Sequence, residues 1–203
     1  MSDGPEDVLA FWFADANASP ARAGERMSFW FGVSEDVDRE IRERFGALLA
    51  RAAGGELASW EDAPRSALAL VIVLDQFSRN VYRGDARAFA QDALGLAAAR
   101  RALARGFDRA LAPIEHAFLL LPLEHAEDLG MQAECVARSR ALAASGPPEW
   151  AETLRGFVPF AEQHRALIAR FGRFPHRNRA LGRRSTLEEE AFLTEGAESY
   201  GQR

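Results

Sequence analysis

The chain has 203 residues, of which 48% are hydrophobic and 27% charged, and its formal net charge is −5. These values are typical of one globular domain long enough to bury a core, and the acidic balance argues against a nucleic-acid binder. A single cysteine, Cys135, excludes an intrachain disulfide, and the lack of lysine excludes Schiff-base chemistry. The longest apolar run, residues 67–74, is far shorter than a membrane span, and no secretory signal opens the chain, so we expect a cytoplasmic protein without a membrane partner.

Helix signals punctuate the first half of the chain. Between them, apolar residues recur at the spacing of one helix face, which predicts successive amphipathic helices. Each predicted helix begins at a residue suited to a helix N-terminus and ends at a glycine. The starts are Ser34, Pro64 and Asp85, and the ends are Gly54, Gly84 and Gly106.

Proline and glycine also divide the second half. We expect a short helix that Pro113 opens and Pro122 closes, because proline suits a first helical position and interrupts a helix interior. A helix over 123–145 follows, and then a long helix over 149–171 that Pro159 would kink or divide. Each of these two helices is followed by a glycine.

The C-terminal part completes an all-α pattern. Thr186 and Glu189 match a capping box for a short helix, and residues 195–203 are expected to fray. The only rival strand is 68–74, and a lone strand cannot build a sheet. We therefore predict an all-α fold of antiparallel helices in a single domain over residues 1–203.

A first polar segment closes the most apolar helix. It includes Asp75, Gln76, Arg79, Asn80 and Arg83. Asp75, Arg79 and Arg83 share one helix face, and two arginines one turn apart repel unless an anion or a carboxylate lies between them. The segment therefore predicts either a bound anion or pairing with buried acids that fixes the packing.

A second polar segment follows Pro122. The proline would place Glu124, Glu127 and Asp128 in the first turn of a helix, where the helix dipole favours acids. His125 precedes Asp128 by about one turn, so the carboxylate can orient the imidazole or raise its pKa. His125 with Glu127 or Asp128 is thus a candidate acid–base group, and equally an ordinary surface pair.

A third polar segment is rich in arginine. It contains Arg173, His176, Arg177 and Asn178, in a stretch without any acidic residue. Arginine forks recognise carboxylate and phosphate groups, and the interleaved aromatic rings can stack on a base. The alternatives are a site for an anionic ligand, RNA binding, which the global charge disfavours, and neutralisation of the acidic helices nearby.

Two copies of an aromatic tripeptide, Phe11-Trp12-Phe13 and Phe29-Trp30-Phe31, occur near the N-terminus. Three consecutive residues cover too much of a helix to face one core, so some would line a pocket or a helix seam, although core packing is the simpler interpretation. Four histidines are present, but no signature of a zinc protease or a di-iron site, so we predict no metal and no cofactor.

The polar segments together resemble one family. The strings that carry the resemblance are Leu-Asp-Gln-Phe-Ser-Arg-Asn from Leu74, Glu-His-Ala-Glu-Asp-Leu from Glu124, and Phe-Gly-Arg-Phe-Pro-His-Arg-Asn from Phe171. They are similar to the bacterial family known as domain of unknown function 924. The resemblance implies a right-handed superhelical, tetratricopeptide-repeat-like arrangement of helices and no established activity. This chain departs from the family pattern at Ser78 and Ala126, where the family usually has proline and serine.

Two functions from different classes follow. The leading hypothesis is that Arg79, Arg83, Arg173 and Arg177 bind an anionic small molecule, which Asn80 and Asn178 orient, with His125 as the acid–base group. The alternative is a non-catalytic adaptor, whose concave helical groove holds a peptide or protein C-terminus by its carboxylate. The sequence does not distinguish an enzyme from a binding protein.

Overall fold

The computed structural model describes residues 3–194, so the predicted fraying of 195–203 lies outside the described part. Within it the chain is all-α, without a strand. The helices of the first half are α1 (Pro5–Phe13), α2 (Pro20–Phe31), α3 (Glu35–Ala53), α4 (Pro64–Val71) and α5 (Ser78–Val81). Those of the second half are α6 (Asp92–Ala104), α7 (Pro113–Glu124), α8 (Leu129–Ser145), α9 (Ala151–Phe171) and α10 (Leu187–Thr194).

Several helix boundaries confirm the punctuation in the sequence. The Ser34 hydroxyl accepts the backbone N–H of Val37 at the start of α3. Gly172 ends α9 in the left-handed conformation at φ 69°, which a residue with a Cβ adopts only at a cost. Thr186 and Glu189 form the predicted capping box: each side chain accepts the backbone N–H of the other.

The prediction that Pro122 separates two helices is wrong. Pro122 lies inside α7, and Glu124 is the last residue of that helix rather than part of the first turn of the next. Asp128 is the N-cap of α8. Pro159 does not divide its helix either, because α9 is continuous over Ala151–Phe171. Asp85 caps a short 3₁₀ helix (Ala86–Phe89) rather than the long helix that follows.

Between α4 and α5 the chain winds as a π-helix over Ile72–Phe77. The whole segment is buried and contains Asp75 and Gln76. π-Helical segments inside α-helices are rare and occur frequently at functional sites. Here the wider turn brings the first polar residues of the 75–83 segment into the centre of the molecule.

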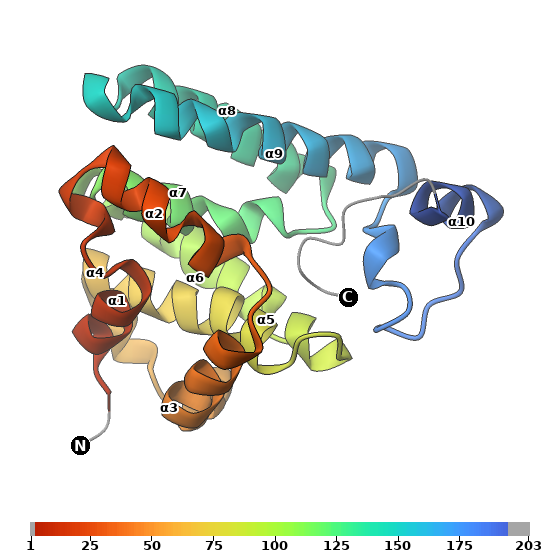
Figure 1. Ribbon diagram of the computed structural model, residues 1–203, viewed down its shortest axis with the longest axis horizontal. Helices are drawn as coiled ribbons and strands as arrows, with labels where there is room; N and C mark the ends of the chain where they lie inside the picture. Colours follow the sequence, from red (N-terminus) through yellow and green to blue (C-terminus); the bar gives the residue numbers. More distant parts are fainter. Residues whose placement is uncertain (1–2, 195–203) are drawn as a thin grey trace.

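The elements pack in layers (Figure 1). α8 and α9 form an antiparallel pair along the top of the view, α7 lies beneath them, and α4 and α6 lie below α7, above α3. The core joins these layers through aromatic residues: Trp12 and Phe13 of α1 and Trp30 of α2 all pack against Phe118 of α7 with edge-to-face geometry. The repeat-like superhelix that the family resemblance implies stays a prediction.

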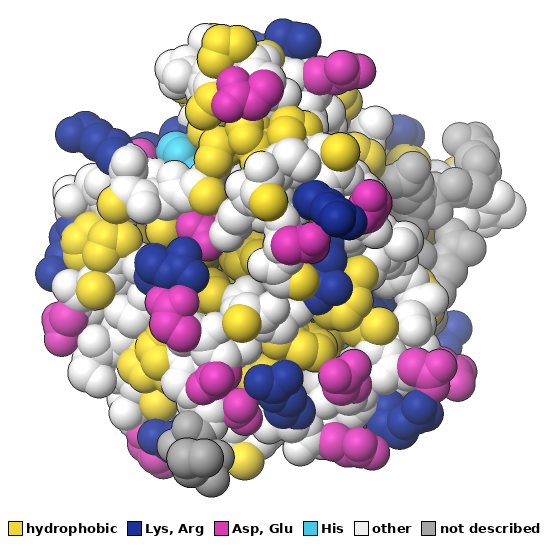
Figure 2. All heavy atoms as spheres, turned by 60° about the vertical axis from the view of Figure 1, so that its left-hand side comes forward, with side chains coloured by type: hydrophobic (Ala, Val, Ile, Leu, Met, Phe, Trp, Pro, Cys, Tyr) yellow, Lys and Arg dark blue, Asp and Glu magenta, His cyan; other side chains and the backbone are white. Residues whose placement is uncertain are grey.

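The surface carries mixed charge. Acidic and basic side chains are interspersed over the face shown in Figure 2. Ion pairs are frequent among the exposed side chains of the described residues, for example Arg22 with Glu25 and Arg140 with Glu162. Among the described residues no helix combines the length and the apolar character needed to cross a membrane.

Candidate functional site

A cavity of about 530 Å³ lies where α2, α5, α7 and α9 meet the segment at Pro175–Arg177. That volume is in the range of sites for small organic ligands. Its polar wall contains Gln76, Arg79, Asn80, Arg83, Glu124, His125, His164, His176 and Arg177. Its apolar wall contains Met27, Trp30, Phe31, Phe89, Leu121, Phe157 and Phe160. The cavity therefore collects residues from all three polar segments of the sequence.

His125, the residue that ends α7, is held by a buried aspartate. Its Nδ1 lies 2.8 Å and 3.0 Å from the two carboxylate oxygens of Asp75. Burial favours the neutral acid, but Arg79 and His125 together outweigh it and hold the pKa of Asp75 below its usual range. An ionised carboxylate only accepts, so Nδ1 of His125 carries the proton that is donated to Asp75.

The other ring nitrogen of His125 then keeps its lone pair. Burial lowers the pKa of His125 below its ordinary value, and the charge of Arg79 lowers it further, while Asp75 acts in the opposite direction. The imidazole is thus neutral at neutral pH, with Nε2 as a proton acceptor. A neutral imidazole oriented by a buried carboxylate is the arrangement that general bases use.

Two arginines of the polar wall share one carboxylate. Nη1 of Arg79 donates to Asp92 at 2.9 Å, and Nη1 of Arg177 donates to the other oxygen of Asp92 at 3.0 Å. Arg79 also pairs with Asp75, one turn before it, as the spacing predicts. Nη2 of Arg79 and Nε of Arg177 are buried and have no acceptor among the described residues. Each guanidinium therefore retains an unused donor.

A second aspartate fixes the neighbouring polar side chains. Asp38 of α3 accepts from Asn80 at 2.8 Å and from Nε of Arg83 at 2.6 Å. Arg83 is therefore not paired with Asp75, although the two share a helix face in the sequence. Gln76 donates to Asp75 at 2.6 Å, so this aspartate is contacted from several sides.

Glu124 and His164 form a second buried pair on the cavity wall. Glu124 Oε1 lies 3.4 Å from Nδ1 of His164, which itself lies 2.9 Å from the carbonyl oxygen of Phe160. Burial, with a contribution from the charge of Asp75, raises the pKa of Glu124 to about 8. Burial lowers the pKa of His164 to about 3. Both side chains are neutral at neutral pH, in contrast to the ionised Asp75 nearby.

The remaining predicted site residues lie outside the cavity. Glu127 accepts the backbone N–H of Phe174 and pairs with Arg183, and Asp128 accepts the backbone N–H of Met131. The prediction that Asp128 orients His125 is wrong, since Asp75 does so. Arg173 pairs with Glu189, and Asn178 donates to Ser185. Glu127 thus ties the C-terminal loop to the end of α7, Asp128 caps α8, and Arg173 and Asn178 make contacts within the C-terminal region.

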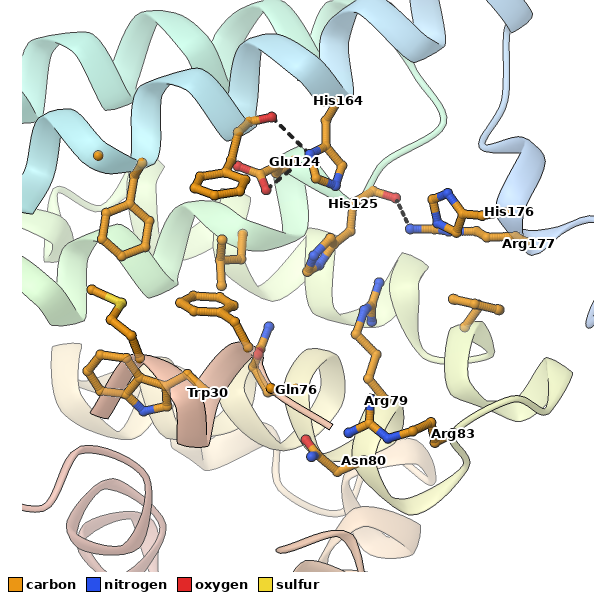
Figure 3. Close-up of a pocket in the computed structure, with 18 of the residues that line it drawn as sticks. Trp30, Gln76, Arg79, Asn80, Arg83, Glu124, His125, His164, His176 and Arg177 are labelled. Atoms are coloured by element: carbon orange, nitrogen blue, oxygen red, sulfur yellow. Dashed lines mark hydrogen bonds and ion pairs between the residues drawn. The ribbon is translucent and has the colours of Figure 1, made fainter. Parts of the chain in front are cut away.

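The sequence left open that some residues of the aromatic tripeptides line a pocket, but it did not identify the contribution of α9 to the apolar wall. Trp12 and Phe13 of the first tripeptide are buried in the core, but Trp30 and Phe31 of the second line the cavity. Figure 3 shows Trp30 at one side of the cavity, with His125, Arg79 and Arg177 toward the other. The available signal was the face of α9, where cavity residues recur at helical spacing. No cluster of three or more His, Cys, Asp or Glu side chains within residues 3–194 is placed to hold a metal ion.

Comparisons with known proteins give a family without an assigned activity. A family profile described as "Bacterial protein of unknown function (DUF924)" matches residues 8–197. A solved structure of a protein of unknown function from Agrobacterium tumefaciens is similar, with a TM-score of 0.79 and 35% identity over 95% of this chain and 97% of that chain. A search of curated proteins finds no match.

Proposed function

The chain belongs to this family of bacterial proteins of unknown function, and we propose that it binds a small organic anion, bearing a carboxylate or a phosphate, in the cavity. The observation that carries the proposal is the polar wall. Arg79, Arg177 and the Asp75–His125 pair converge there from three distant parts of the chain.

The hydrogen-bonding state of the two arginines supports an anionic ligand. A buried donor without an acceptor costs about 1–3 kcal/mol, so a rearrangement that brings Nη2 of Arg79 or Nε of Arg177, both enclosed by protein atoms, to an oxygen of the ligand would be favourable. A carboxylate or phosphate can take hydrogen bonds from more than one guanidinium at once. A small shift of the two side chains would let such a group replace part of their bonding to Asp92.

Charge balance at the polar wall predicts that the protein takes up a proton when the anion binds. Arg79, Arg83 and Arg177 are matched by Asp75, Asp38 and Asp92, so an incoming anion leaves the wall negative unless a proton follows. His125 is the group that takes it, because its Nε2 is basic and the anion favours the imidazolium. In that protonated state His125 would act on a bound ligand as a general acid.

A thermal-shift screen tests the proposal. The panel contains inorganic phosphate, phosphorylated metabolites, monocarboxylates and dicarboxylates. A ligand at about 100 times its dissociation constant stabilises the native state by about 2.7 kcal/mol, or roughly 5–11 °C in Tm for a chain of this size. Arg177→Gln is expected to weaken binding of the active ligand at least tenfold, and Arg173→Gln, in the same loop but paired with Glu189 outside the cavity, to leave it unchanged.

The wild-type protein gives an independent readout. Since Arg177→Gln also removes a buried partner of Asp92, its fold is checked by circular dichroism, and His125 is titrated by NMR with and without ligand. An anion at the polar wall raises the pKa of His125 relative to the free protein. Equal losses in the two arginine variants, or a His125 titration that no anion moves, would refute the proposal.

The adaptor hypothesis remains the second candidate, and one observation favours it. Phe31 and Phe160, on the cavity wall, are 48% and 49% exposed, which suits contact with a larger partner. The cavity volume favours the small ligand, because only the last residues of a peptide would enter it. Peptides with a free C-terminal carboxylate and their amidated counterparts distinguish the adaptor from the small-ligand hypothesis. A Tm shift that only the free-carboxylate peptides produce, and no small anion produces, supports the adaptor and the repeat-like groove that the family resemblance implies.

A further inference from the structure

The cavity is divided into two chemically different parts. Toward one side lie His125, Arg79 and Arg177, and toward the other lies Trp30 (Figure 3). A ligand that carried only an anionic group would leave the aromatic part in contact with water. The division therefore constrains the rest of the ligand as well as its charged group.

The helix α9 runs along both parts. Its cavity residues are Thr153, Gly156, Phe157, Phe160 and His164, which recur on one helix face. The residue at the C-terminal end of this stripe is a histidine, and the two aromatic residues precede it. At 1.5 Å per residue the stripe is about 16 Å long, so the cavity is elongated along the helix.

The polarity of α7 changes in the same way. Leu121 belongs to the apolar wall, while Glu124 and His125, at the end of the same helix, belong to the polar wall. α2 supplies only apolar cavity side chains, Met27, Trp30 and Phe31. The cavity residues of α7 and α9 thus both become polar toward the C-terminal end of the helix, and α2 lines only the apolar part.

The aromatic part is accessible from outside. Phe31 and Phe160 are each about half exposed, at 48% and 49%, although large apolar side chains are costly to leave in water. A Cβ built at Gly156 meets no atom within 4 Å, so the face of α9 one turn before Phe160 is open. An elongated apolar group laid along α9 would cover these surfaces.

We propose that the ligand is a linear amphipathic anion, with its charged group at His125, Arg79 and Arg177 and its hydrocarbon body along the aromatic face of α9. This inference rests on the proposed anion-binding function and adds the chemical class of the ligand. A carboxylate and a phosphate supply the same head-group chemistry, and the experiment distinguishes them.

Calorimetric titration of the full chain with butyrate, hexanoate, octanoate and decanoate tests the class. Affinity is expected to rise about fourfold for each added methylene, the equivalent of about 0.8 kcal/mol per buried CH₂, until the chain exceeds the apolar part. Octyl phosphate tests the alternative head group. Octanol, which has a comparable chain but no charge, is expected to bind at least tenfold more weakly than octanoate.

Gly156→Leu provides the matched variant. Leucine is favoured over glycine inside a helix by about 0.5–1 kcal/mol, and its side chain would extend from α9 into the open apolar part, so the variant is expected to fold and to block the long ligand. The control is Gly24→Leu, which changes an exposed glycine inside α2 that also meets no atom within 4 Å and does not line the cavity. Octanoate affinity is expected to fall at least tenfold in Gly156→Leu alone, while butyrate affinity changes little.

The outcomes separate this inference from the function on which it rests. Affinity independent of chain length, with short anions still bound, would overturn the amphipathic class and keep anion binding. Octanol binding as tightly as octanoate would overturn anion binding and keep the apolar part. Failure of every member of the series to bind, or equal binding by the two glycine variants, would overturn the assignment of the cavity.

Discussion

Single residues at the site owe their protonation both to burial and to the charges beside them. Glu124 and Asp75 are both buried carboxyls, yet the pKa of Glu124 is raised to about 8 and that of Asp75 is lowered. The difference lies in the neighbouring side chain: Asp75 pairs with the cation Arg79, whereas Glu124 lies beside His164, which is neutral. The site thus holds two buried acids of opposite protonation: a neutral Glu124 beside His164 and an ionised Asp75 beside His125.

Glu124→Gln is expected to stabilise the protein on the alkaline side. The native pKa of Glu124 lies near 8 and its unfolded pKa near 4.5, so its contribution to the free energy of unfolding is fully present below about pH 4.5 and is lost as the pH rises toward 8. Glutamine does not ionise, so the variant is expected to gain on the order of a few kcal/mol over wild type between about pH 5 and pH 8.

Urea unfolding of the variant and the wild type at about pH 5 and at about pH 8 measures this gain in stability. Glu152→Gln, at an exposed position of α9, is the control and is expected to change stability equally little at each pH. A constant difference between Glu124→Gln and wild type across the range would contradict a buried, protonated Glu124.

At the scale of elements, helix ends were the predictable part. A cap such as Ser34 or Gly172 depends on residues within one turn, so the sequence alone locates it. The π-helix over Ile72–Phe77 and the passage of α7 through Pro122 were not predicted. Both depend on burial against other helices, which outweighs the local preference.

The end of α7 shows how one element supports the site on another. Gln132 of α8 is fully buried, and its Nε2 donates to the carbonyl oxygen of Ala126 at 2.8 Å and also to that of Glu124. These two residues flank His125. An α8 side chain therefore satisfies the carbonyl groups left open where α7 ends.

Gln132→Leu is expected to destabilise the protein by about 2–4 kcal/mol, because it leaves the buried carbonyl group of Glu124 and the half-buried one of Ala126 without this donor. Urea denaturation measures the loss, and the His125 resonance reports whether the imidazole loses its orientation. Gln163→Leu on the exposed face of α9 is the control, with an expected change within about 0.5 kcal/mol. A stability loss in Gln132→Leu no larger than in the control would show that water replaces the side chain at these carbonyls.

At the scale of the whole molecule, the site consists of contacts between distant segments. His125 meets Asp75 fifty residues away, and Arg177 meets Asp92 across a separation of 85. Periodicity identifies the face of a helix but not the partner of that face, so the sequence predicted the three polar segments without their pairings. It also assigned Arg173 and Asn178 to the ligand, because composition does not separate an arginine that lines a cavity from one that anchors a loop.

Burial of neutral histidines around this centre predicts how the whole protein responds to acid. Burial, with smaller contributions that include the Arg177 charge, lowers the pKa of His176 to about 3, and the pKa of His164 is equally low. Their unfolded pKa is near 6.5, so the stability they contribute is present above that value and is lost as the pH falls toward 3. Glu124 acts in the opposite direction, because the stability that it contributes is lost as the pH rises from about 4.5 to 8.

Stability is therefore expected to be highest near pH 6.5. On unfolding between about pH 6.5 and 4.5, His164 and His176 take up two protons while Glu124 releases one, and below pH 4.5 only the two histidines contribute. These three groups give the loss of stability at acid pH a slope on the order of 1–3 kcal/mol per pH unit, and the lowered pKa values of His116 and His125 add to it. Above pH 6.5 the fall in the free energy of unfolding comes from Glu124, so Glu124→Gln is expected to abolish this fall. His176→Gln is expected to make the fall at acid pH less steep. Melting temperatures across this pH range measure both falls, and a wild-type maximum near pH 8 or a fall that the matching variant leaves unchanged would contradict neutral burial of these groups.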